Sequence, residues 1–148
     1  MAERRAFVDT NVLLYAHDAS ETVKQPVAAA ALTDLWRHRT GTISTQVLQE
    51  FYVTATRKLA QPLTRAEARE VVELYSTWPV VTIDPAVVLA ATRTEEDHQV
   101  SFWDALILES ARVAGAEILL SEDLQHGQEI GGVRIENPFV SGTGSLAT

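Results

Sequence analysis

Four acidic residues are the side chains of this sequence best placed to do chemistry together. Asp9 directly follows a short apolar segment, and Asp123 closely follows another, residues 118–120. Glu50 lies inside an expected helix, past its first turn, and Asp104 lies near the start of a later helix. Carboxylate oxygens suit hard cations such as Mg²⁺ or Mn²⁺. Ions held in this way can activate water and stabilise a leaving oxygen at phosphorus.

Each of these acids also has an ordinary structural explanation. Asp9 can cap the helix that follows it. Asp104 stands three residues after Ser101, which is the spacing of a capping box, and Asp123 can form a turn. Glu50 borders an apolar helix face, as many solvated glutamates do. Only their joint placement, after two strands, inside one helix and at the start of another, favours a shared site.

The elements that must position these acids alternate between short apolar strands and helices. This alternation predicts an α/β fold with a central parallel β-sheet flanked by helices. In such sheets, ligands bind beyond the carboxyl ends of the strands. Strands are expected at residues 4–8, 42–43, 80–83, 118–120 and 133–135. Helices are expected at residues 11–17, 23–39, 45–59, 64–75, 84–97 and 101–114.

Length and composition limit the class of protein. The chain has 148 residues, of which 46% are apolar, so one globular domain over residues 1–140 is expected, with residues 141–148 as a flexible tail. The absence of cysteine excludes disulfides, zinc ribbons and thiol nucleophiles. No leader-like or membrane-spanning apolar run is present, so a cytoplasmic protein without membrane contact is expected. A net charge of −8 argues against a broad basic surface for nucleic acid.

Other catalytic motifs are missing from the chain. It contains no dinucleotide or P-loop glycine pattern, no GxSxG and no HExxH, and its four histidines have no ligand spacing. A haloacid dehalogenase-like phosphatase would also place its nucleophile at Asp9. That class has a second aspartate two residues later, where this chain has Asn11, and a suitably placed lysine is lacking.

Four stretches of the sequence together resemble the PIN-domain ribonucleases, and more narrowly the toxins of VapBC toxin–antitoxin pairs. The resemblance runs from about Phe7 to Phe139, and its order and spacing are more specific than any one motif. The stretches are FVDTNVLLYA, QVLQEFYVTATRK, SFWDALILESA and LLSEDLQHG. The resemblance implies a PIN-like fold, with a central parallel sheet and helices on both faces.

The resemblance also assigns roles to residues of this chain. Asp9, Glu50, Asp104 and Asp123 match the family's four acids, which bind Mg²⁺ or Mn²⁺ and are catalytic. Thr10, Asn11 and Ser121 match polar residues that support the site. Where relatives often have an aromatic residue after the fourth acid, this chain has Leu124, which leaves Glu122 as a possible alternative ligand. Asp123 is preferred because its spacing from the preceding strand fits the family.

The activity implied by this resemblance is metal-dependent endoribonuclease cleavage that leaves 5′-phosphate and 3′-hydroxyl ends. The implied biological role is that of the toxin of a type II toxin–antitoxin pair, forming a homodimer and binding a cognate antitoxin. A housekeeping RNA-processing PIN nuclease and a catalytically silent PIN-like binding module are the alternatives.

The densest local group of basic residues could bind RNA or could equally be a solvated helix face. It comprises Arg57, Lys58, Arg65 and Arg69.

Overall fold

The computed structural model describes residues 4–140 and has the expected α/β architecture. Its strands are β1 (Ala6–Val8), β2 (Gly41–Ser44), β3 (Val80–Val81), β4 (Ile118–Leu120), β5 (Glu129–Ile130) and β6 (Val133–Glu136). Its helices are α1 (Thr10–Ala16), α2 (Lys24–His38), α3 (Thr45–Arg57), α4 (Arg65–Tyr75), α5 (Pro85–His98) and α6 (Phe102–Val113). The expected tail, residues 141–148, lies outside the described residues.

The strands form one sheet in the order β3-β2-β1-β4-β6-β5. Every neighbouring pair is parallel except β5 and β6, which form an antiparallel hairpin. The chain order reverses at β1, because β2 lies on one side of it and β4 on the other. The carboxyl ends of these three parallel strands therefore meet at one edge, at the kind of switch point where α/β sheets bind ligands.

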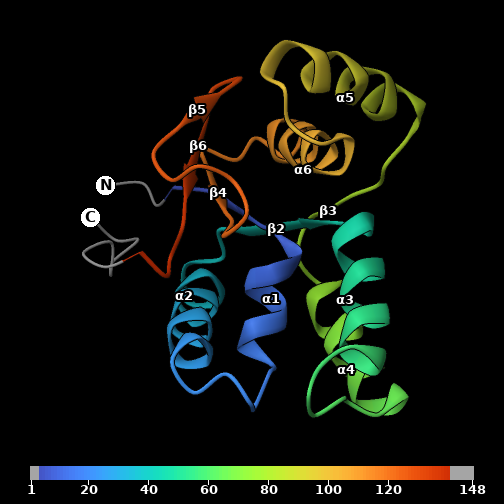
Figure 1. Cartoon of the computed structure of the whole chain (residues 1–148), viewed down its shortest axis with the longest axis vertical. Coiled ribbons are helices and arrows are strands. Elements are labelled where there is room, and N and C mark those ends of the chain that lie inside the picture. The colour runs from blue at the N-terminus through green and yellow to red at the C-terminus, as the bar shows by residue number, and fades with distance from the viewer. Residues whose placement is uncertain (1–3, 141–148) are drawn as a thin grey trace.

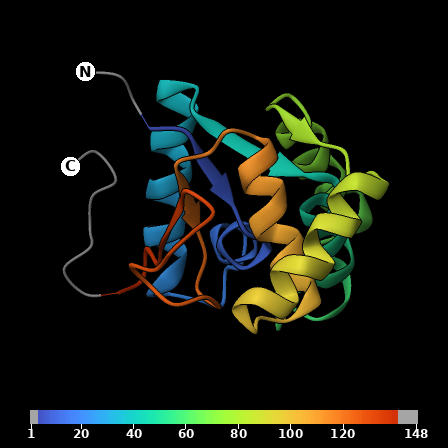
Figure 2. The same ribbon diagram turned by 90° about the horizontal axis from the view of Figure 1, so that it is seen from above.

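Helices cover both faces of the sheet, as predicted. Figure 1 shows α1, α2, α3 and α4 below the strands and α5 and α6 above them. From above, α5 and α6 lie side by side across the strands (Figure 2). The loop after β1 leads directly into α1, and β2 leads directly into α3, so both helices begin at the edge where the parallel strands end.

The central strands are buried on both faces, and their sequences explain why. All residues of β1 and β4 are buried apolar side chains, as is typical of a parallel strand with helices on each side. Pairing of Phe7 with Leu119 and of Val8 with Leu120 sets Asp9 and Ser121 level with each other just beyond the sheet. The register of two short strands thus brings two candidate site residues together.

The sheet also contains a strand that the sequence did not predict. β5 has only two residues and turns into β6 through Gly131 and Gly132, both with positive φ. Such a short, half-polar segment lacks the apolar run by which the other strands were found. β3 is shorter than the expected residues 80–83.

Within residues 4–140, no helix is both long and apolar enough to span a membrane.

Candidate active site

Asp9 combines the role of a helix cap with a position in the candidate site. It is the N-cap of α1, and its Oδ1 accepts a hydrogen bond from the backbone N–H of Thr10 at 2.7 Å. Its Oδ2 accepts one from the Ser121 hydroxyl at 2.8 Å and a longer one from the Asn11 amide at 3.5 Å. The carboxyl group is therefore held by α1 and by the loop after β4 at once.

Burial dominates the electrostatics of Asp9. The residue is only 4% exposed, and burial raises its pKa from 3.8 to about 7. Hydrogen bonds from Ser121 and Thr10 act in the opposite direction, while the charges of Asp123 and Asp104 raise the pKa further. A carboxyl group in this position favours either a proton or a nearby cation at neutral pH.

Glu50 reaches the same region from the second turn of α3. Its Oε1 accepts a 2.6 Å hydrogen bond from the Thr10 hydroxyl, so Thr10 bridges the carboxylates of Asp9 and Glu50. The buried Gln46 amide donates to Glu50 Oε2 at 3.3 Å and to the carbonyl of Trp103 at 3.4 Å. Gln46 therefore ties α3 to the start of α6. No sequence signal marked it, because a glutamine four residues before a glutamate is an ordinary helical pair.

Asp104 faces the other acids from the first turn of α6. The Ser101 hydroxyl caps this helix by accepting from the Asp104 backbone N–H at 3.1 Å. Partial burial raises the pKa of the Asp104 carboxyl, the Ser101 hydroxyl lowers it, and the charges of Asp123 and Glu50 raise it. Helix capping explains the position of this residue in α6, but not the three other acids around it.

The loop after β4 carries Glu122 and Asp123, the two candidates for the fourth acid of the site, and their side chains have different surroundings. Glu122 accepts hydrogen bonds from the Tyr15 hydroxyl at 2.7 Å and from Lys24 at 2.5 Å. These contacts hold its carboxylate against residues of α1 and α2. Asp123 is exposed, and its backbone N–H donates to the Ser121 hydroxyl at 3.2 Å. The preference for Asp123 over Glu122 as the ligand stays a prediction.

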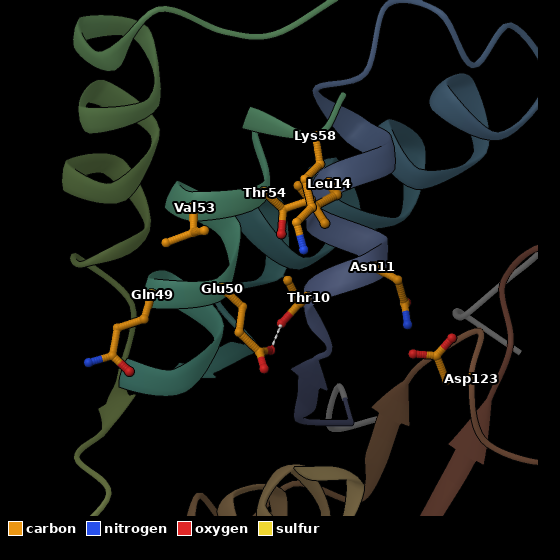
Figure 3. Close-up of a pocket in the computed structure, with 9 residues that line it drawn as sticks. All are labelled: Thr10, Asn11, Leu14, Gln49, Glu50, Val53, Thr54, Lys58 and Asp123. Carbon is orange, nitrogen blue, oxygen red and sulfur yellow. Dashed lines mark hydrogen bonds between the residues drawn. The ribbon is translucent and has the colours of Figure 1, made fainter. Parts of the chain in front are cut away.

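Glu50 and Asp123 face each other across a pocket of about 540 Å³, which we call the acid pocket. In Figure 3, the Glu50 carboxylate accepts a hydrogen bond from the Thr10 hydroxyl, while the Asn11 amide points toward Asp123. Lys58 extends its amine down the wall formed by α1 and α3. The pocket is lined by Thr10, Asn11, Leu14, Gln49, Glu50, Val53, Thr54, Lys58 and Asp123.

The basic residues singled out in the sequence divide between two places. Lys58 lines the acid pocket. The three arginines, Arg57, Arg65 and Arg69, instead surround a second, polar pocket of about 610 Å³ between the end of α3 and the start of α4. The structure therefore puts one basic residue beside the acids and groups the other three together.

The donor chemistry of the four acids fits a hard divalent cation. All the donors are oxygens; burial is the main cause of the raised pKa of Asp9 and Asp104, and the charges of neighbouring acids add to it. Nevertheless, among residues 4–140 no group of three histidine, aspartate or glutamate side chains is spaced to hold an ion as it stands. The arrangement shows mutual proximity of the acids and a buried carboxylate, rather than a completed coordination shell.

The chain belongs to the PIN domain family, whose model matches residues 6–128. This span begins at β1 and ends after the loop that carries Asp123, so it includes all four acids. The expected PIN-like fold is thus confirmed. No curated protein sequence matches the chain.

Solved structures with a similar fold include several toxin–antitoxin proteins. A toxin–antitoxin complex from Klebsiella pneumoniae is 22% identical, with a TM-score of 0.67, over 90% of this chain and 97% of that one. VapC20 of Mycobacterium tuberculosis, a toxin that cleaves the sarcin–ricin loop, is 21% identical, with a TM-score of 0.62 and coverage of 80% and 91%. DNA-bound VapBC from Salmonella typhimurium is 20% identical, with a TM-score of 0.62 and coverage of 91% and 98%.

Proposed function

We propose that this protein is a metal-dependent endoribonuclease that acts as the toxin of a type II toxin–antitoxin pair. The observation that carries the proposal is the placement of four interacting acids from separate elements near the carboxyl edge of the sheet, one of them buried with a pKa of about 7. Membership of the PIN family and the similar folds of the toxins described above support the same activity.

Mg²⁺ or Mn²⁺ is the cofactor that suits this site. Asp9, Glu50, Asp104 and Asp123 would hold it, with Asp9 as the least exposed of the four. When bound, the cation would lower the pKa of a water molecule and offset charge on the phosphodiester. It would also offset the burial and the neighbouring negative charges that together raise the pKa values of Asp9 and Asp104.

The chain's own polar residues would keep the carboxylates in place. The Ser121 hydroxyl and the Thr10 N–H stabilise the ionised form of Asp9 by donating to both of its oxygens. The Thr10 hydroxyl holds Glu50 Oε1 in place through a 2.6 Å hydrogen bond. Lys58, on the wall of the acid pocket, is positioned to attract a phosphate of the RNA into a region that otherwise repels anions.

The partners that we propose are RNA, a cognate antitoxin and a second copy of the chain, in the cytoplasm. Neighbouring structures are toxin–antitoxin complexes, which supports an antitoxin partner. An arginine or lysine of an antitoxin, directed at the carboxylates, would compete with the metal ion for the site. The net charge of −8 would also favour association with a basic partner.

Cleavage of purified total RNA tests the proposed activity. The wild-type protein, freed of antitoxin, and Asp9→Asn are each incubated with Mg²⁺ and with EDTA. We expect discrete fragments with 5′-phosphate ends only for the wild type with Mg²⁺. Absence of cleavage together with absence of metal binding would contradict the proposal and favour a silent binding module.

A further inference from the structure

Three depressions adjoin one another along α3 and form a single track. The acid pocket shares Gln49 and Val53 with an apolar groove of about 360 Å³ between α3 and α4. That groove shares Tyr52 and Arg69 with the pocket that holds the three arginines, which we call the arginine pocket. The track therefore leads from carboxylates, across apolar side chains, to guanidinium groups.

The arginine pocket concentrates positive charge in a protein of net charge −8. Arg57 comes from the last turn of α3, while Arg65 and Arg69 are one turn apart at the start of α4. All three are exposed. Within residues 4–140, none of these guanidinium groups forms an ion pair, in contrast to Lys24 and Arg112, which pair with glutamates. The three side chains line the pocket and are accessible to solvent.

We propose that the track binds single-stranded RNA, with the arginine pocket holding backbone phosphates next to the strand segment in the acid pocket. This inference rests on the proposed function and specifies how its substrate is held. Guanidinium groups pair well with phosphate oxygens, often through two hydrogen bonds. Seven residues separate Glu50 from Arg57, which is about 10 Å along a helix, so a strand of a few nucleotides would reach both pockets.

The apolar groove between the two pockets favours a single strand over a duplex. Its lining includes Leu48, Val53, Val72 and the partly buried Tyr52. Unpaired bases can pack against aromatic and apolar side chains, whereas a duplex presents mainly phosphates and hydroxyl groups. A track of alternating charged and apolar surface therefore matches a strand whose bases are turned out.

The salt dependence of RNA binding tests this assignment directly. The probe is a short, fluorescently labelled, unstructured RNA, and its affinity is measured by anisotropy in EDTA, so that the RNA is not cleaved. Arg65→Gln/Arg69→Gln is compared with the wild type and with Arg37→Gln/Arg93→Gln. The control pair removes the same charge from exposed positions on α2 and α5, outside the track. Thermal melting confirms that all the proteins are folded.

We expect the track variant to bind more weakly and with a shallower salt dependence. Two lost phosphate contacts reduce the slope of log K against log salt by about 1.4, so that between 50 and 200 mM salt the wild type loses about 7-fold more affinity than the variant. The control pair should keep the wild-type slope. Adding Arg57→Gln should reduce the slope by about a further 0.7.

An unchanged slope in the track variant would overturn the inference, whether or not the wild type cleaves RNA. If that variant instead lost binding to a polyglutamate peptide, the pocket would belong to an acidic protein segment. Failure of the wild type to cleave RNA with Mg²⁺ would contradict the proposed activity alone, because binding in EDTA is measured independently of it.

Discussion

Replacement of Asp9 by asparagine should stabilise the metal-free protein above neutral pH. The folded-state pKa of Asp9 is about 7, whereas the ordinary value is 3.8. Between these values the folded protein holds a proton that the unfolded chain has released, so stability falls as pH rises. At about 1.4 kcal/mol per pH unit, the ionised, buried carboxylate costs up to about 4 kcal/mol at pH 8. Asparagine cannot ionise and avoids this cost.

The hydrogen bonds around Asp9 offset part of that gain. An asparagine oxygen can still accept from the Thr10 N–H, which leaves its NH₂ group facing Ser121 and the Asn11 amide. The Ser121 hydroxyl can rotate to accept a hydrogen bond from this NH₂ group. The NH₂ group of Asn11 cannot, because it is itself only a donor. The loss is about 1–2 kcal/mol, leaving a net stabilisation of about 2–3 kcal/mol at pH 8, or about 6–9 °C in Tm for a chain of this size.

The assay is thermal melting of both proteins in EDTA from pH 4.5 to pH 8.5. Asp9→Asn should melt higher than the wild type at pH 8, and the difference should vanish or reverse near pH 4.5, where the wild-type carboxyl is protonated. Glu129→Gln, which removes one charge from an exposed residue of β5, is the control and should change little. A wild type that is more stable than Asp9→Asn at pH 8 would refute the assignment of a costly buried carboxylate.

Three further substitutions test other parts of the structure. Ser121→Ala removes a 2.8 Å hydrogen bond to Asp9, and we expect a 10- to 100-fold loss of Mn²⁺ affinity in calorimetry; unchanged affinity would contradict a supporting role. Gly41→Ala places a methyl group 2.5 Å from the Trp78 ring and should lower the free energy of unfolding by about 1–3 kcal/mol in urea titrations; an unchanged value would contradict tight packing of this ring. Thr64→Ala removes half of the capping box of α4 and should cost about 1 kcal/mol in the same assay, whereas Thr64→Ser should cost much less.

The sequence predicted the elements whose local signals agree with their packing. The capping box at Thr64 and Glu67 is present, and the buried apolar runs of β1 and β4 are central parallel strands. β5 was missed because two residues, one of them exposed, carry no periodic pattern. Its position depends on pairing with β6, which is a tertiary contact.

The acids of the candidate site could be proposed from the sequence, but their contacts could not. The resemblance to PIN ribonucleases indicated both Asp9 and the loop acids, but only the structure shows Glu122 held by Lys24 and Tyr15. Likewise, the bridging role of Gln46 depends on how α3 packs against α6. Contacts between segments far apart in sequence are set by the fold, and no local pattern encodes them.

The basic residues also show that a local sequence pattern does not determine which pocket a side chain enters. In the sequence, Arg57, Lys58, Arg65 and Arg69 form one basic group. The turn between α3 and α4 directs Lys58 into the acid pocket and the three arginines into another. Adjacent residues near a helix end point in different directions, so sequence proximity alone could not separate these roles.

Titration of the protein with Mn²⁺ tests the central claim most directly, namely that the four carboxylates form one cation site. Calorimetry compares the wild type with Glu50→Gln, Asp104→Asn and Asp123→Asn, and with Glu73→Gln as an exposed control on α4. We expect binding by the wild type and the control, and at least 10-fold weaker binding by each of the three site variants. Binding that is equally strong in all five proteins, or absent from the wild type, would contradict it.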